Sequence, residues 1–311
     1  MIFKVGEKRI EYFTKYRISE FYNAICGTFE LTGVKDTSGI AGERCQLLFD
    51  NGDLIMDCYV NRITNSDEVS PTEPNVSGNS EAGILAESHI AQADYPLEVR
   101  NYNLEDIIRK ITGRYEFGYR IFEADYNDSL KPFDKVDLDM SQTLEEIIKG
   151  LALQRGLFLT HAADGTDSTL QLTGRPLASA KIYDYWQYVE NWTVNEDYSG
   201  MHREITVVMQ SSDTHEGGKF TIINKYCPVF KARTETMRDG NPKDIEKYAK
   251  KILASELLGI EATFNCRRWI PIGNILPFKD REWFITETVI EGDATGESYS
   301  YKAVLKQVYE V

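Results

Sequence analysis

The sequence has few of the side chains that enzymes and metalloproteins most often use for chemistry. Its 311 residues include four histidines, His89, His161, His202 and His215, which lie far apart in the chain. The five cysteines are an odd number and form no Cys-x-x-Cys pair. We therefore expect reduced, buried thiols rather than a disulfide framework or a zinc site. Reduced thiols are typical of synthesis in a cytoplasm.

Long apolar runs and an excess of positive charge are also missing. The longest apolar runs span only a few residues, so we expect no segment to cross a bilayer as a helix and no stable membrane association. The chain has 35 Lys and Arg against 49 Asp and Glu, a net charge of −14. Stable binding to nucleic acid is not expected, because that affinity comes from cations that neutralise phosphates.

Catalytic motifs are absent as well. The sequence contains no G-x-S-x-G, no H-E-x-x-H and no phosphate-binding glycine loop between a strand and a helix. Two acidic stretches leave one enzymatic alternative open, because a glycosidase needs only two carboxylates across a cleft. These stretches hold Glu123, Asp125 and Asp128, and Asp134, Asp137 and Asp139. We favour solvated loops for both, and expect no catalytic residue, no cofactor, no metal site and no enzymatic activity.

The pattern of short strands and turns predicts an α+β fold that is mainly β. Asn51-Gly52 between two apolar runs predicts a hairpin with a type I′ turn. The many short runs in residues 1–94 fit a small antiparallel β-barrel domain. Residues 177–311 return to strands, predict a second small barrel and close with a hairpin around Gly292 to Gly296. One long helix, 241–259, interrupts this last third.

Between the two barrels, residues 95–176 predict a compact α+β domain. A helix over 103–113 begins at a capping asparagine, and a helix over 143–156 begins with a capping box of Thr143 and Glu146. A hairpin follows the second helix. The apolar stripe of the second helix is expected to form the core of this domain, and its members are Leu144, Ile147, Ile148 and Leu151.

An aromatic segment at 181–192 is the candidate interaction surface. Amphipathic rings are favoured where two protein surfaces meet. Stacking on bases would need basic neighbours, and only Lys181 is close. We therefore predict a seam between domains or subunits rather than a nucleic-acid platform. The interface residues are Tyr183, Tyr185, Trp186, Tyr188 and Trp192.

The order of these elements resembles one family, the baseplate hub proteins of contractile-tailed phages such as Mu. Each matching stretch is degenerate and structural, none is a catalytic signature, and their order is more persuasive than any one of them. The four stretches are VSGNSEAGILAES at 76–88, YNLEDIIRKITGRYEF at 102–117, LDMSQTLEEIIKGLALQRGLFLTHAADGTDSTLQLTG at 138–174 and ENWTVNEDYSGMHREITVVMQ at 190–210.

The resemblance implies a structural hub that is a homotrimer. Three chains with two barrels each would form a ring of six similar units, which adapts a hexameric tail tube to a trimeric membrane-piercing spike. The implied partners are the spike protein, the tail tube or its terminal ring, surrounding baseplate proteins, and DNA only in transit during genome ejection. The implied location is the virion tail baseplate, after synthesis in the bacterial host cytoplasm.

Two alternatives stay open beside the hub. One is a tail-tip cell-wall hydrolase that would use the acidic stretches. The other is the equivalent hub of a contractile bacteriocin or injection machine. For a hub, the net charge of −14 suggests an acidic channel lining that would repel passing DNA.

Overall fold

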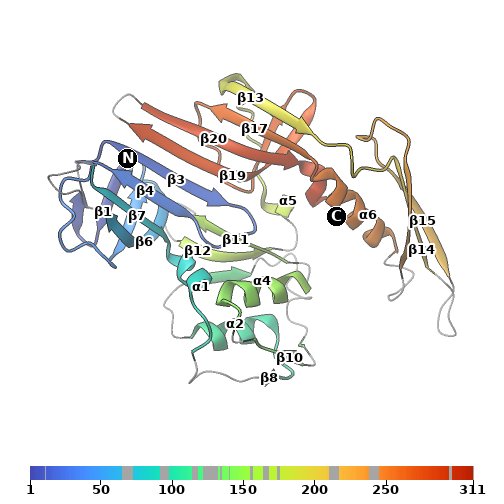
Figure 1. Cartoon of the computed structure of the whole chain (residues 1–311), viewed down its shortest axis with the longest axis horizontal. Coiled ribbons are helices and arrows are strands. Elements are labelled where there is room, and N and C mark those ends of the chain that lie inside the picture. The colour runs from blue at the N-terminus through green and yellow to red at the C-terminus, as the bar shows by residue number, and fades with distance from the viewer. Residues whose placement is uncertain are drawn as a thin grey trace.

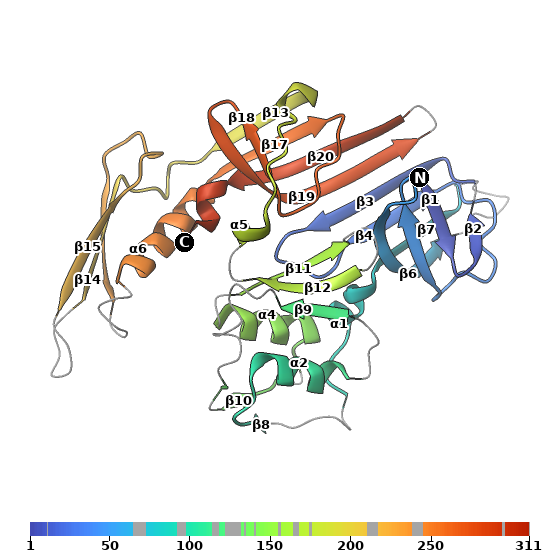
Figure 2. The same cartoon turned by 180° about the vertical axis from the view of Figure 1, so that it is seen from behind.

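The chain is built mainly of strands, with a few helices gathered on one side and at one end (Figure 1, Figure 2). The structure is a computed structural model that describes residues 1–10, 12–64, 73–91, 98–113, 118–121, 132–133, 135–139, 141–154, 157–163, 168–173, 176–209, 217–237, 245–293 and 296–310. The predicted mainly β fold is confirmed.

One curled, twelve-stranded sheet contains strands from both ends of the chain. Its order is β13-β17-β20-β19-β3-β4-β7-β6-β5-β1-β2, and β18 pairs with β19. The N-terminal strands are β1 (Ile2–Val5), β2 (Lys8–Ile10), β3 (Lys15–Phe21), β4 (Thr28–Thr32), β5 (Arg44–Leu48), β6 (Leu54–Thr64) and β7 (Asn75–Ser80). The C-terminal strands are β13 (Val189–Glu196), β17 (Ile260–Cys266), β18 (Ile275–Phe278), β19 (Arg281–Asp293) and β20 (Gly296–Leu305).

The two regions expected as separate barrels are joined edge to edge. β3 pairs with β19 over seven residues, from Phe21 opposite Glu287 to Lys15 opposite Asp293. The two regions also share one hydrophobic core, which includes side chains from both ends of the chain. Two separate barrels are therefore not confirmed, because a continuous hydrogen-bonded order runs through both regions.

The hairpin at Asn51-Gly52 is confirmed, but its turn differs from the predicted type I′. Gly52 alone of the two has a positive φ, 92°. Its N–H donates to the carbonyl of Phe49 at 2.9 Å, and the N–H of Phe49 donates to the carbonyl of Asp53 at 2.9 Å. The Asn51 side chain accepts from the N–H of Asp53 at 3.0 Å. This is a longer loop with a glycine bulge, in which the asparagine holds the turn through its side chain.

The middle of the chain forms a separate layer against one side of the sheet (Figure 2). The predicted capping box is present: the Thr143 hydroxyl accepts from the N–H of Glu146 at 3.2 Å, and the Glu146 carboxylate accepts from the N–H of Thr143 at 2.8 Å. The predicted stripe of the second helix is buried. The elements are η1 (Glu81–Gly83), α1 (Ile84–Glu87), β8 (Glu98–Val99), α2 (Leu104–Thr112), β9 (Gly118–Ile121), β10 (Val136–Asp137), α4 (Leu144–Gln154), β11 (Phe158–Ala163), β12 (Ser168–Thr173) and α5 (Pro176–Ser179).

A small three-stranded sheet and one helix form an arm at one end of the molecule (Figure 1). The strands are β14 (Glu204–Met209), β15 (Gly218–Ile223) and β16 (Ala232–Met237), in the order β15-β14-β16. The helix α6 (Ile245–Leu257) packs on this sheet through its own apolar cluster. It ends at Leu257, before the predicted end at 259, and residues 241–244 of the prediction lie outside the described part of the chain.

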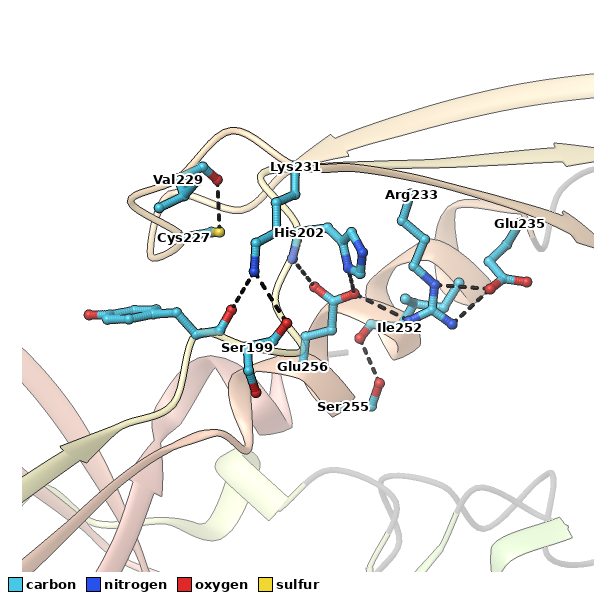
Figure 3. A network of polar contacts seen from close by, with 11 residues as sticks. Ser199, His202, Cys227, Val229, Lys231, Arg233, Glu235, Ile252, Ser255 and Glu256 are labelled. Atoms are coloured by element: carbon cyan, nitrogen blue, oxygen red, sulfur yellow. Dashed lines mark hydrogen bonds and ion pairs between the residues drawn. The ribbon is translucent and has the colours of Figure 1, made fainter.

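A polar network around the buried carboxylate of Glu256 holds the arm together, and Lys231 ties the arm to the end of β13 (Figure 3). Glu256 on α6 accepts from the backbone N–H of His202 at 2.9 Å, and its other oxygen lies 2.8 Å from the His202 ring. Arg233 on β16 contacts the same carboxylate at 3.3 Å and also pairs with Glu235. The Lys231 ammonium donates to the carbonyls of Tyr198 and Ser199, which follow β13. The arm is thereby tied to the end of β13.

Candidate assembly surface

The two halves of the large sheet have the same strand connectivity. In the first half, β3, β4, β5, β6 and β7 follow one another in the chain and lie in the order β3-β4-β7-β6-β5. In the second half, β13, β17, β18, β19 and β20 follow one another among the strands of this sheet and lie in the order β13-β17-β20-β19-β18. The second half is therefore a structural repeat of the first, with the arm inserted between β13 and β17.

Irregular features of the two halves also agree. A bulge interrupts the β6–β7 pairing between Val60 and Arg62, and a bulge interrupts the β19–β20 pairing between Ile285 and Glu287. A short 3₁₀ helix directly follows the last strand of each half: η1 follows β7, and η6 (Lys306–Tyr309) follows β20. Bulges are features that a fold retains for a purpose, so their matching positions support the repeat.

The turns that lead into β5 and β18 are built alike. The N–H of Gly42 donates to the carbonyl of Val60 at 2.9 Å, and the N–H of Gly273 donates to the carbonyl of Ile285 at 3.0 Å. Both glycines are left-handed, with φ of 74° and 77°, a conformation that only glycine adopts without strain. The same backbone solution therefore appears at equivalent points of both halves.

The pairing of β3 with β19 is the junction between the two halves. Arg17 and Glu291 lie directly opposite each other there and form an ion pair. The Tyr16 ring covers Gly292, where a Cβ atom would come within 2.3 Å of the ring. Glu20 is buried at 6% exposure opposite Thr288, whose buried hydroxyl has no hydrogen-bond partner among the described residues. A carboxyl group is therefore enclosed at this junction.

Glu20 makes the stability of the junction depend on pH. Burial raises its pKa from 4.5 to about 7, so the folded protein favours the neutral acid. Burial of the Glu20 carboxyl costs no extra folding free energy below pH 4.5, where the group is protonated in both the folded and the unfolded protein. The cost grows as the pH rises toward 7. We expect Glu20→Gln to raise the free energy of unfolding by about 2 kcal/mol at pH 8. This is less than the full pKa shift would give at roughly 1.4 kcal/mol per pKa unit. Urea unfolding at pH 8 and pH 4.5 checks this, and an equal gain at both pH values would contradict it.

β13 is an edge of the sheet and carries one of the predicted interface residues, Trp192, while Trp186 lies in the turn before it. Among the described strands it pairs only with β17. Trp192, on β13, is 44% exposed, and its ring lies 5.6 Å from the ring of Phe278. The Lys279 ammonium lies 3.5 Å from the centre of the Trp192 ring. Trp186, in the 3₁₀ turn η4 (Trp186–Tyr188), is 57% exposed beside a hollow of about 640 Å³.

The three tyrosines of the predicted interface have a different environment. Tyr183, Tyr185 and Tyr188 are half-buried against the core that the two halves share. Their rings contact one another edge to face, at 5.4 Å and 5.6 Å. Burial raises the pKa of Tyr183. The structure therefore separates the aromatic segment into half-buried tyrosines packed on their own sheet and tryptophans that stay largely exposed. A role in contacts between subunits stays a prediction.

Glu196, at the end of β13, is held in a fixed position by neighbours. The Tyr198 hydroxyl donates to its carboxylate at 2.7 Å, and the Arg281 guanidinium lies 2.5 Å from its other oxygen. The hydrogen bond from Tyr198 and the charge of Arg281 lower the pKa of Glu196. The end of the edge strand is therefore ordered and negatively charged.

The face of the sheet opposite the shared core is polar. A hollow of about 770 Å³ opens over β3, β4, β6 and β7 on this face. Positive, negative and small hydroxyl side chains alternate across it, so these residues form no continuous cationic track. One row of paired positions consists of Arg62, Ser77, Glu30, Arg17 and Glu291.

The acidic stretches of the hydrolase alternative are described only in small part. Glu123, Asp125, Asp128 and Asp134 lie outside the described residues, as does the side chain of Asp137. Asp139 accepts from the N–H and the hydroxyl of Ser141, both at 2.8 Å, and these bonds lower its pKa. These bonds from the residue two positions on are those of an Asx turn, in which the Asp139 side chain stabilises the loop.

The histidines do not come together in the described part of the structure. The His89 ring contacts the carbonyl of Gln142 at 2.9 Å, and His202 belongs to the Glu256 network. The side chain of His161 and all of His215 lie outside the description. Within the described residues no group of three or more His, Cys, Asp or Glu side chains could hold a metal ion. None of the described helices has the length and apolar character needed to cross a membrane.

Comparison with known proteins shows which proteins have a similar fold. No protein-family model and no curated protein matches the chain. The 43 kDa tail protein of prophage MuSo2 from Shewanella oneidensis matches with a TM-score of 0.76 at 17% identity, over 100% of this chain and 99% of that one. The tail protein from Neisseria meningitidis MC58 matches with a TM-score of 0.71 at 19% identity, over 99% and 97%. The chain has the fold of phage tail proteins.

The same fold extends beyond phages. The c3393 protein of E. coli, described as a type VI secretion component with structural similarity to T4 bacteriophage tail proteins, matches with a TM-score of 0.65 at 7% identity, over 98% of this chain and 77% of that one. The resemblance to phage tail proteins, which the sequence indicated through the order of its elements, is thus confirmed at the level of fold.

Proposed function

We propose that this tail-protein fold acts as a baseplate hub, a structural homotrimer without enzymatic activity. The observation that carries the proposal is the repeat within the sheet. Each chain supplies two half-sheets of equal connectivity, so three chains supply six similar units. Such a ring has the symmetry of a hexameric tail tube on one side and of a trimeric spike on the other.

The division of labour follows from this ring. Residues 1–94 and 177–311 would supply the two barrel-like units, and residues 95–176 would form an α+β domain outside the ring. Tube, spike and surrounding baseplate proteins would be the partners, with the virion tail baseplate as the location. DNA would only pass through. The mixed charges of the polar face support that role, because without a cationic track the face does not hold phosphates.

Imaging of the native particle with a labelled chain tests the proposal. The expected result is threefold density, marked by the label, between the tail tube and the spike. Particles that carry the label elsewhere, or that show no ring at this position, would contradict the proposal. The particle is the sample of choice because free chains can stay monomeric before assembly.

The hub of a contractile bacteriocin or injection machine is the second candidate. The match to a type VI secretion component at a TM-score of 0.65 favours it, since that fold serves outside phages. A capsid with packaged DNA in the labelled particle would decide for the phage, and tails without capsids would decide for the injection machine. For the hydrolase, no observation on the described residues speaks in its favour.

A further inference from the structure

We propose that the free edge of β13 pairs with the end of β6 in a second copy of the chain, in the register that β3 and β19 use within one chain. The inference rests on the proposed ring and goes further by naming its contact residues. It follows from the repeat: β13 is the counterpart of β3, and β6 is the counterpart of β19. Within one chain, β3 pairs with β19, whereas β13 has no strand on the corresponding side among the described residues.

The backbone of β13 is ready for such a partner. The N–H of Asp197, just past the strand, donates inward to the carbonyl of Gly259 at 2.8 Å. Because successive residues of a strand direct their backbone groups to opposite sides, Glu196 directs its N–H and carbonyl to the free side. An edge strand of eight residues with open backbone groups is a template for another strand.

The end of β6 has a matching free side. β5 and its preceding turn cover β6 as far as Val60, whose N–H donates to the carbonyl of Glu43 at 3.1 Å. Beyond Val60, the described residues of β6 pair with β7 on the other side only. On β19 the equivalent stretch beyond Ile285 is the part that pairs with β3. Arg62 to Thr64 of β6 are therefore the counterparts of Glu287 to Val289, the first residues of β19 that pair with β3.

Side-chain burial shows what the missing neighbour does. On β3, the side chains that face the core beside β19 are closed off: Tyr16 at 7%, Ile18 at 0% and Glu20 at 6% exposure. When the halves are aligned at their bulges, the registers place three side chains of β13 at the same positions. These are Trp192 at 44% exposure, Val194, which is half-buried, and Glu196, which is exposed. The same positions are sealed at the junction and open at the edge.

The alignment also fixes the register of the proposed contact. Thr64 of the second copy lies opposite Asn195, as Val289 lies opposite Ser19 in the chain itself. Arg62 of the second copy lies opposite Asp197. This pair brings opposite charges together across the strands, as Arg17 and Glu291 do at the junction within the chain.

A disulfide cross-link tests this register in assembled particles. The N–H of Tyr22 donates to the carbonyl of Thr286 at 2.8 Å, which makes the Ser19 position a non-hydrogen-bonded one. The corresponding Asn195 and Thr64 would then have Cα atoms about 4.5 Å apart, within disulfide range. We expect Asn195→Cys with Thr64→Cys to yield chains linked into covalent trimers under mild oxidation, roughly tenfold more than the control pair described next.

The matched control moves one cysteine by two residues on the same face of β13. Thr193→Cys with Thr64→Cys places the thiols on the diagonal, too far for a bond, and each single variant controls for the natural cysteines. As a second measurement, Arg62→Glu is expected to weaken assembly roughly tenfold, and the swap with Asp197→Arg is expected to restore it.

The outcomes separate the contact from the proposed function. A threefold ring whose chains fail to link at Asn195 and Thr64, or link equally well in the control, overturns the contact and leaves the hub in place. Efficient linking in an assembly that is not a ring between tube and spike overturns the hub and leaves the contact in place. Linking within such a ring supports both.

Discussion

Gly78→Ala is expected to lower the free energy of unfolding by about 3 kcal/mol, the upper end of the usual cost of an added core methyl group, because that group meets backbone and not a movable side chain. Gly78 lies in β7 beside the bulge of β6. A Cβ atom there would lie 1.8 Å from the carbonyl oxygen of Tyr59 and 2.6 Å from the ring of Phe29. β6 and β7 would have to separate where the sheet core is packed.

Gly150→Ala is the matched control for this prediction. Gly150 lies exposed within α4, and an added Cβ meets nothing within 4 Å. There the same exchange is expected to raise stability by roughly 0.5 to 1 kcal/mol, because alanine favours a helix over glycine. Thermal and urea unfolding of both variants checks the pair. A loss for Gly78→Ala below about 1 kcal/mol would show that the sheet yields locally at the bulge.

Ile148→Ala is expected to cost about 2 to 5 kcal/mol, the usual range for emptying a well-packed core site. Ile148 is fully buried at 0% exposure between α2, α4 and the neighbouring strands of the middle layer. Because this cluster is distinct from the core of the large sheet, we expect the variant to lose stability in the middle layer while the ring still assembles.

Lys149→Ala serves as the neighbouring control, since Lys149 is only partly covered. A change within about 0.5 kcal/mol is expected there. Urea unfolding measures the loss, and the oligomeric state of the variant measures assembly. A cost of Ile148→Ala no larger than that of its control would contradict the helix register, and failed assembly with an intact fold would contradict the separation of the two cores.

Features encoded within a few residues of one another were predictable from the sequence. The capping box of Thr143 and Glu146 and the hairpin at Gly292 to Gly296 depend on contacts between neighbours in the chain. The Asn51-Gly52 hairpin was predicted for the same reason. Its turn type was wrong, because the Asn51 side chain competes for the backbone in a way that the dipeptide rule ignores.

The junction between the halves was not predictable. β3 and β19 are far apart in the sequence, and no local pattern says which edge pairs with which. The repeat was hidden for another reason: in strands aligned through the bulges, only Glu20 and Glu196 are identical residues. The two halves share strand connectivity, bulge positions and left-handed glycines, but not amino-acid sequence.

The aromatic segment shows the limit of reading a surface from composition. Its rings are similar in type, but the 3₁₀ turn η4 directs Trp186 outward while Tyr185 and Tyr188 pack onto their own sheet. Neighbouring rings in this turn therefore differ in burial: one packs against the core and the next is exposed. The sequence predicts that the segment is a contact region, and only the backbone says which rings are free to contact another chain.

A strand-level reconstruction of the ring in native particles tests the central claim most directly. The claim is that each chain supplies two equivalent units to one assembly. It predicts three chains around one axis, six equal lobes of density, and β13 of each chain covered by β6 of its neighbour as β3 is covered by β19. A ring in which the two halves of a chain occupy unlike positions, with β13 open to solvent, would contradict it.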